Sequence, residues 1–229
     1  MKRVAILQSN YIPWKGYFDL IASVDEFILY DEVQYTRRDW RNRNQIKTEY
    51  GRKWLTVPVV TKGLYDQTIN NTRIANHDWQ SRHWHALVTN YRSAPHFERI
   101  ATWLEPLYQE RHERLAELNR SYLDTICANL GLQTSIRDCR ELTLVQGKTE
   151  RLVSLCQQTG ADVYLSGPSA KSYLDERLFD AAGIAVEWCD YSNYPAYAQL
   201  WGEFVHEVSI LDLLFNCGPD APKYMKYVR

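Results

Sequence analysis

The chain has 229 residues, in which 27 lysines and arginines face 28 aspartates and glutamates, so its formal net charge is −1. This length suffices for a sizeable hydrophobic core, in one large domain or two small ones. The near-neutral charge gives no electrostatic reason for binding nucleic acid or an anionic membrane. No apolar run reaches the about 18 residues that a membrane span requires, and no secretory signal pattern opens the chain. We therefore expect a cytoplasmic protein with no membrane span and no nucleic-acid partner.

The five cysteines lack the spacing of metal ligands, and their odd number does not favour a disulfide framework. We expect buried free thiols, because free cysteine behaves as a small apolar side chain. The sequence predicts no metal site.

The first elements of the chain are predicted to be a strand, a helix and a second strand. Residues 4–7 are apolar, a polar turn follows, and Pro13 and Gly16 lead into a helix. A second apolar run over residues 24–30 ends at Asp31. Such a βαβ unit implies a parallel sheet with a right-handed crossover. Because ligands bind beyond the carboxyl ends of parallel strands, we expect the chemistry in the segments that follow these two strands.

The remainder of the chain predicts further strands and two groups of helices. Residues 53–60 form a strand-like run, and residues 78–130 carry apolar side chains at helical spacing, with Gly131 as a terminating residue. Strand and helix patterns then alternate in the order 134–136, 148–160, 161–167, 169–182, 184–188 and 209–215. We predict a single Rossmann-like α/β domain over residues 1–229, with a mainly parallel sheet and a helical insertion at about residues 78–130.

The turn from Gln8 to Tyr17 is the first candidate site. Gly16 permits close approach of the backbone, and a helix that begins there directs free N–H groups and the positive end of its dipole toward an anion. Polar and aromatic groups crowd the turn, and we predict that they bind the substrate: Gln8, Asn10, Tyr11, Trp14, Lys15, Gly16 and Tyr17. A plain strand-to-helix turn is the alternative.

The segment 31–47 is the second candidate, because it carries four arginines among amide and aromatic side chains. Guanidinium groups bind phosphate or carboxylate through paired hydrogen bonds, and amides suit sugar hydroxyls. We predict substrate contacts from Gln34, Tyr35, Arg37, Arg38, Arg41, Asn42, Arg43 and Asn44. Asp31 is a candidate general base or magnesium ligand, although no spacing signature supports either role. The alternative is a solvated loop held by local salt bridges.

The segment 164–175 is the third candidate, because a strand, a small-residue turn and a helix follow one another there. We predict substrate contacts from Ser166 and Gly167, and charge stabilisation from Lys171 in the first helical turn. The spacing of a phosphate-binding loop is absent. A structural helix cap is the alternative.

A histidine or a carboxylate is expected to transfer protons, since imidazole titrates near neutrality. The candidates are Asp31 and His83, which lies beside Arg82 and Trp84. His77 and His206 have the same chemical capacity. The sixteen tyrosines and eight tryptophans suit a wide pocket for a polar, ring-shaped ligand such as a sugar or a nucleobase. Alternatively, these rings fill ordinary core and surface positions.

Several motifs, taken in order along the chain, together resemble the WbqC-like protein family. They are Gln8-x-Asn10-Tyr11-Ile12-Pro13-Trp14-x-Gly16-Tyr17-Phe18, Asp31-x-Val33-Gln34-Tyr35, Asn42-Arg43-Asn44-x-Ile46-Lys47, Trp54-Leu55-x-Val57-Pro58-Val59, Tyr164-Leu165-Ser166-Gly167 and Ser209-Ile210-Leu211-Asp212. The resemblance covers nearly the whole chain. Two positions depart from it: Ser9 stands where the family usually has proline, and Cys139-Arg140 stands where it often has two serines.

The family is tied to O-antigen and related surface-polysaccharide gene clusters, and a glycine or other aminoacyl transferase role has been suggested for its members. The resemblance therefore implies a bacterial transferase that attaches an aminoacyl or acyl group to a nucleotide-activated sugar or a related small molecule. The partner would be a small molecule with a phosphate or a carboxylate. The alternatives are an enzyme of nucleotidyl transfer or amide formation that uses ATP and magnesium, or a non-catalytic nucleotide-sugar binding protein. No cofactor is firmly implied.

A more distant resemblance is to the nucleotidylyltransferases of the HIGH superfamily. The run from Pro13 to Tyr17 falls where those enzymes carry His-x-Gly-His, and the turn at 166–171 resembles their second phosphate motif. Trp14 and Tyr17 replace the two histidines, which stabilise charge on the transferring phosphate. The resemblance therefore implies a shared fold more than a shared mechanism.

Overall fold

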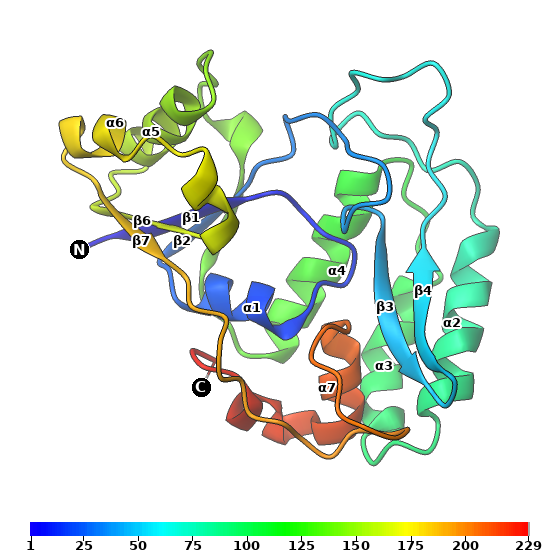
Figure 1. Cartoon of the computed structure of the whole chain (residues 1–229). Helices are drawn as coiled ribbons and strands as arrows, with labels where there is room; N and C mark the ends of the chain where they lie inside the picture. The colour runs from blue at the N-terminus through cyan, green and yellow to red at the C-terminus, as the bar shows by residue number, and fades with distance from the viewer. Residues whose placement is uncertain (229) are drawn as a thin grey trace.

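The computed structural model describes residues 1–228, and its centre is a sheet of five parallel strands (Figure 1). The strands lie in the order β5-β2-β1-β6-β7, and every neighbouring pair is parallel. Their bounds are β1 Arg3–Leu7, β2 Glu26–Leu29, β5 Ser135–Asp138, β6 Val163–Ser166 and β7 Ala185–Trp188. This is the strand order of a doubly wound sheet, in which the direction of winding reverses between β1 and β6. The predicted Rossmann-like α/β fold is confirmed.

Helices cover both faces of this sheet, which explains why its central strands β1, β2 and β6 are mostly apolar and buried. Alternate residues of β1 belong to different hydrophobic clusters: Ala5 packs with the cluster of Phe18, and Val4 with that of Phe179. In Figure 1, α1 lies below the sheet, and α5 and α6 lie above it. These helices span Lys15–Ala22, Thr149–Gln158 and Glu176–Ala181. The segment expected as one helix over 169–182 is divided into a 3₁₀ turn, Pro168–Ser172, and α6.

A large insertion separates β2 from β5. The three helices expected in it are present as α2 Asp78–Tyr91, α3 Phe97–Leu107 and α4 Leu115–Asn129. They are preceded by an antiparallel hairpin of β3 Arg43–Thr48 and β4 Gly51–Thr56, which the sequence pattern indicated only in part. The hairpin is hard to recognise because arginine, amide and lysine side chains interrupt the apolar alternation of β3. The other bounds are α7 Ile210–Cys217, and 3₁₀ turns at Cys139–Glu141 and Gly218–Tyr224.

Residues 189–209 connect β7 to α7 without any helix or strand. Connections longer than about 12–15 residues without secondary structure are uncommon in folded domains, and they are often functional. This 189–209 segment crosses the molecule from the sheet to the insertion, as the orange trace in Figure 1 shows. Within residues 1–228, no helix combines the length and the apolar character that crossing a membrane demands.

A buried carboxylate fixes the 189–209 segment in place. Asp212, which is fully buried, accepts hydrogen bonds of 2.7 Å from each of Tyr91, Tyr197 and Gln199. Gln199 in turn accepts a bond of 2.8 Å from the ammonium of Lys47 on β3. Burial raises the pKa of Asp212, against the opposing effect of these hydrogen bonds. The network therefore joins the segment to α2, α7 and the hairpin.

We predict that Asp212→Ala lowers the free energy of unfolding by about 3 kcal/mol, because two buried hydroxyl groups and a half-buried amide lose their acceptor. Urea denaturation measures this loss, and limited proteolysis should show new cleavage between residues 189 and 209. Asp220→Ala is the control, since the exposed Asp220 carboxylate contacts Lys223 at the surface. Equal stability of the two variants would show that the network does not hold the segment.

Candidate functional site

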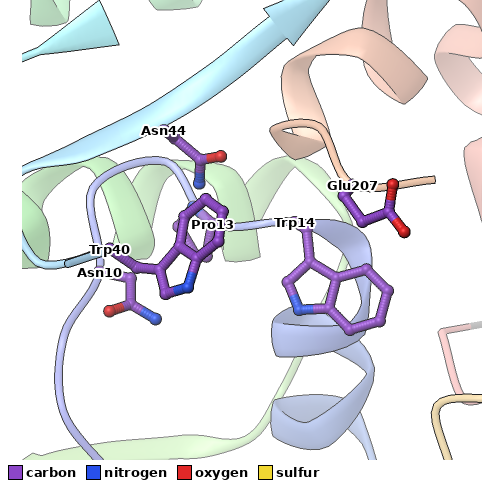
Figure 2. A pocket seen from close by; sticks show the side chains of 6 residues that line it. All are labelled: Asn10, Pro13, Trp14, Trp40, Asn44 and Glu207. Atoms are coloured by element: carbon purple, nitrogen blue, oxygen red, sulfur yellow. The ribbon is translucent and has the colours of Figure 1, made fainter. Parts of the chain in front are cut away.

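A cavity of about 210 Å³ lies where three loops of the carboxyl side of the sheet converge. The loop between β1 and α1 contributes Asn10, Pro13 and Trp14; the chain that follows β2 contributes Trp40 and Asn44; and the 189–209 segment contributes Glu207 (Figure 2). We call this cavity the first cavity. In Figure 2, the Trp40 ring overlaps Pro13, the Trp14 ring lies to the right of both, and Asn44 reaches in from β3. Beyond the carboxyl ends of parallel strands is where small ligands bind in doubly wound proteins.

Trp14 is held by aromatic neighbours and by the absence of a side chain at Gly16. Its ring packs edge-on against Tyr191 and Tyr194, with centroid separations of 5.3 and 5.6 Å. A Cβ atom at Gly16 would lie only 2.3 Å from Cζ2 of Trp14. Glycine is therefore required here for the indole to lie across the first turn of α1.

Trp40 is the exposed wall of the cavity, with 43% of its surface accessible. Its ring is 5.4 Å from that of Trp54 on β4, and the guanidinium of Arg43 lies 4.0 Å from the Trp54 ring. Such stacking fixes an exposed indole at the mouth of the cavity without burying it. An accessible, oriented tryptophan is a good platform for a ring-shaped ligand.

Asn10 is oriented by Arg41. The guanidinium of Arg41 donates a hydrogen bond to Oδ1 of Asn10, and it lies 3.8 Å from the Asp39 carboxylate. The Nδ2 amino group of Asn10 then faces the cavity, as Figure 2 shows. The backbone N–H of Tyr11 also donates to the carbonyl of Trp40 at 3.1 Å. The predicted contact between the first two candidate segments is therefore present.

The backbone around the first cavity is strained. Ile12 has φ of 38°, in a region that β-branched residues rarely adopt. Asn44 stabilises this conformation, because its Nδ2 donates to the carbonyls of Tyr11 and Ile12 at 3.2 and 2.9 Å. The other non-glycine residues of 1–228 with positive φ lie in the same three loops: Arg38, Asn193 and Trp201. Such strain gathers at functional sites.

Glu207 reaches the cavity because the end of its segment is bonded to both other walls. The N–H of Ser209 donates to the carbonyl of Gln45 at 2.8 Å, and the N–H of Ile210 donates to that of Pro13 at 2.9 Å. The Glu207 carboxylate remains 71% exposed, 3.6 Å from the guanidinium of Arg52. Glu207 is the acidic residue among the six that line the first cavity.

Asp31 holds the loop after β1 and does not line the first cavity. Its carboxylate, 3% exposed, accepts a 2.8 Å hydrogen bond from the N–H of Ser9. Burial raises the pKa of Asp31, and the bonds from Ser9 oppose this rise. Nδ2 of Asn119 donates to Oγ of Ser9 at 3.0 Å and to the carbonyl of Arg41 at 2.9 Å. These contacts make Asp31 a positioning residue, and proton transfer by it stays a prediction.

His83 is buried in an aromatic cluster of α2, α3 and α4. Its Nδ1 lies 3.0 Å from the hydroxyl of Tyr11, with Trp79, Tyr108 and Tyr122 around them. Burial lowers the pKa of His83 to about 3, so the ring is neutral at physiological pH. His83 is outside the lining of the first cavity, and proton transfer by it stays a prediction.

The third candidate segment does not line the first cavity. The ammonium of Lys171 lies 5.3 Å from the ring centre of Trp188, at the exposed surface. Ser166 is buried in β6, and a Cβ at Gly167 would lie 3.8 Å from the hydroxyl of Tyr191. This segment therefore approaches the site only through Tyr191, a neighbour of Trp14. Of the three candidate segments, the first two therefore contribute residues to the lining of the first cavity, and the third does not.

Most other predicted residues make contacts that stabilise the loops. Arg37 donates to the carbonyl of Thr61 and Arg43 to that of Arg38, while Gln34 donates to that of Tyr65. Buried Asn42 donates to the carbonyl of Val57, and Tyr17 to that of Gln8; Tyr35 is buried. Among the predicted residues, Asn10, Trp14 and Asn44 line the cavity.

Sequence reasoning did not single out Pro13, Trp40 or Glu207 as site residues. Trp40 carried a usable signal, because it lies between charged residues in the segment that connects the second strand to the hairpin. Glu207 carried none, since it lies in an irregular segment far along the chain. All five cysteines are buried and free, as predicted. Within residues 1–228, no three histidine, cysteine or acidic side chains are grouped as metal ligands would be.

The fold is a doubly wound α/β sheet with an aromatic, polar cavity at its carboxyl edge, which is the edge where doubly wound proteins commonly bind their ligands. The sequence model of the WbqC-like protein family matches residues 8–224, and the chain belongs to this family. The chain is also 57% identical over 230 residues to the uncharacterized protein Rv1507c of Mycobacterium tuberculosis (strain ATCC 25618 / H37Rv), with each chain covered completely. No solved structure matches significantly. These matches do not show the resemblance to the HIGH superfamily.

The low pKa of His83 predicts a loss of stability in mild acid. The unfolded chain binds a proton near pH 6.5 and the folded chain only near pH 3, so stability falls as the pH drops through this window. From pH 7 to pH 5 we expect a loss of about 2 kcal/mol, measured by urea denaturation. His83→Gln should flatten this dependence, whereas His85→Gln, on the exposed face of α2, should not. An unchanged slope in His83→Gln would contradict the assignment.

Gly16→Ala should displace Trp14 from Tyr191 and Tyr194, because the new methyl group overlaps the indole ring. We expect a changed near-ultraviolet circular dichroism spectrum and a melting temperature lower by several degrees. Gly167→Ala is the matched control, since its Cβ meets nothing closer than 3.8 Å. If both variants give the wild-type spectrum, Gly16 does not position Trp14.

Proposed function

We propose that this protein is a transferase of surface-polysaccharide (O-antigen) biosynthesis. It binds a nucleotide-activated sugar or a related small molecule in the first cavity, and it attaches an aminoacyl (glycine-like) or acyl group to an amino or hydroxyl group of that ligand. Membership of the WbqC-like family supports the pathway, through the gene clusters to which the family is tied. The lining of the cavity supports the class of ligand.

The two tryptophans of the first cavity carry this proposal. A sugar ring has apolar C–H faces and a polar rim, so it matches indole walls combined with amide and carboxylate groups. Trp14 and Trp40 supply the walls, while Asn10 and Glu207 supply polar groups. The volume of about 210 Å³ suits one ring better than a whole nucleotide-sugar. The rest of the ligand would extend over the hairpin.

The surface beside Trp40 suits an activating phosphate group. Arg43 stacks on Trp54 there, and Arg41 lies behind Asn10. Planar guanidinium groups bind phosphates through paired hydrogen bonds, and stacking against an indole fixes their orientation. A ligand ring on Trp40 would therefore place its phosphates within reach of Arg43.

Glu207 is the proposed proton acceptor of the reaction. It lines the cavity, whereas Asp31 and His83, of which we expected this role, hold the surrounding loops. A carboxylate beside an amino or hydroxyl group takes up the proton as that group attacks the acyl carbon and the leaving group departs. The rest of the rate acceleration would come from the positioning of the two reactants and from the charges around them, without a covalent intermediate.

Calorimetric titration with nucleoside diphosphate sugars, sugar phosphates and ATP tests the proposal. We expect a nucleotide-sugar to bind, and Trp40→Ala to weaken its binding at least tenfold with little change in melting temperature. The control is Tyr50→Ala, which removes a 94% exposed ring at the tip of the hairpin. Equal binding by Trp40→Ala and the wild type would contradict the site.

The same titrations separate the alternatives. ATP binding that depends on magnesium, without nucleotide-sugar binding, would favour nucleotidyl transfer or amide formation. Tight nucleotide-sugar binding with no transfer from any activated acyl donor would favour a non-catalytic binding protein. In a transferase, Glu207→Gln should abolish transfer and leave the affinity for the sugar within about threefold.

A further inference from the structure

A second cavity, of about 260 Å³, lies on the other side of Trp14. Its lining consists of Trp14, Tyr191, Asn193, Tyr194, His206 and Glu207. Trp14 and Glu207 also line the first cavity, so the two cavities share one wall. A reaction that joins two molecules requires two adjacent subsites of this kind.

Lys15 lies behind this second cavity as a buried cation. Only 4% of the residue is exposed, and its ammonium donates one hydrogen bond, of 3.2 Å, to the carbonyl of Pro195. Three rings surround the ammonium, with centroids at 4.9 Å for Tyr194, 5.3 Å for Tyr197 and 5.9 Å for Phe204. Among residues 1–228, no carboxylate forms an ion pair with it.

A buried charge is costly unless an opposite charge compensates it. Burial lowers the pKa of Lys15 to about 8, which shows that the ammonium is poorly compensated. Asp19 on the same helix, and Cys217 and Asp212 on α7, act from beyond ion-pair distance. Asp212 is moreover committed to its own three donors.

Lys15 does not line the second cavity but adjoins it through Tyr194, which lines the cavity and lies 4.9 Å from the ammonium. Burial, and after it the charge of Lys15, lower the pKa of His206, which lines the cavity. Tyr194, another lining residue, forms part of the cage around the ammonium. The cavity also meets the amino end of α1, because Trp14 is the residue that precedes this helix and no side chain caps it there. Free N–H groups at a helix start favour an anion.

We infer that the second cavity binds the carboxylate or phosphate group of a second small molecule, with Lys15 as its counter-charge and Trp14 between it and the ligand of the first cavity. This inference deepens the proposed function, on which the identity of the first ligand rests. The negative group of the second molecule supplies the compensation that Lys15 lacks within the protein. Its other end then lies beside Glu207, the carboxylate that both cavities share.

A purely structural role for Lys15 is the competing explanation. Tyr194, Tyr197 and Phe204 all belong to the 189–209 segment, so the caged ammonium also anchors this segment to α1. The two roles differ in their response to small anions. A structural anchor requires no anion, whereas a ligand subsite responds to one.

Titration with inorganic phosphate, acetate and methylammonium, followed by the imidazole resonances of His206, tests the inference. His206 lines the second cavity and is absent from the lining of the first, so its signal reports on the second. We expect phosphate or acetate to shift the signal in a saturable manner, and methylammonium to leave it unchanged. The tighter anion identifies the group that the site takes. A response to methylammonium alone, or to none of the three, overturns the inference.

Two substitutions at Lys15 provide the matched comparison. Lys15→Met keeps the length of the side chain without the charge and should weaken anion binding at least tenfold. Lys15→Arg keeps the charge and should retain most of the affinity. If Lys15→Met folds and binds phosphate and acetate as the wild type does, Lys15 is only an anchor. If Lys15→Met does not fold, the role of Lys15 is tested instead by comparing how the anion affinities of Lys15→Arg and of the wild type depend on pH.

The affinity of the wild type should fall as the pH rises past about 8, because the ammonium loses its proton there. Above that value we expect about a tenfold loss per pH unit. In Lys15→Arg the affinity should stay level up to pH 10, since arginine remains charged. Equal pH dependence in the two proteins contradicts the inference.

The test of the second cavity can fail or succeed independently of the test of the proposed function. Trp40 lines only the first cavity, so Trp40→Ala should bind phosphate or acetate as the wild type does. Anion binding without any nucleotide-sugar binding would remove the proposed function and leave the second site. Nucleotide-sugar binding without a response of His206 to anions would remove the second site and leave the proposed function.

Discussion

The site depends on one polar contact, in which the amide of Asn44 holds the strained turn after β1. Asn44 lies on β3 of the insertion, and its two hydrogen bonds to the carbonyls of Tyr11 and Ile12 compensate a backbone conformation that isoleucine rarely adopts. Asp31 holds the beginning of the same turn through Ser9. Pro13 and Trp14 follow directly, so the inner wall of both cavities takes its position from these bonds.

Buried charges then hold the 189–209 segment against the loop after β1 and the chain after β2, which form the other walls of the first cavity. Lys15 at the start of α1 and Lys47 on β3 each reach into the 189–209 segment, and Asp212 binds two of its side chains from α7. Buried charges and amides are costly unless their partners are in place, so they specify one arrangement of an irregular segment better than apolar contacts do. Glu207 owes its position to this arrangement. The aromatic walls therefore rest on a polar framework.

The sequence was most informative where one physical pattern dominated. Apolar runs and a glycine at the start of α1 predicted the central βαβ unit, and helical periodicity predicted α2, α3 and α4. The hairpin was partly missed because Arg43, Gln45 and Lys47 conceal the alternation of β3. The turn after β1 and the segment after β2 were rightly expected to approach each other, since parallel strands end at one edge. Glu207 was out of reach, because no local pattern reveals which long-range hydrogen bonds an irregular loop will form.

The walls of the first cavity come from parts of the chain that the ribosome makes at very different times. Trp14 emerges early and Trp40 soon after, while Glu207 follows 167 residues after Trp40. Until then, the nascent protein presents two tryptophans without the carboxylate opposite them. Incomplete translation products that end before Glu207 therefore lack the finished cavity.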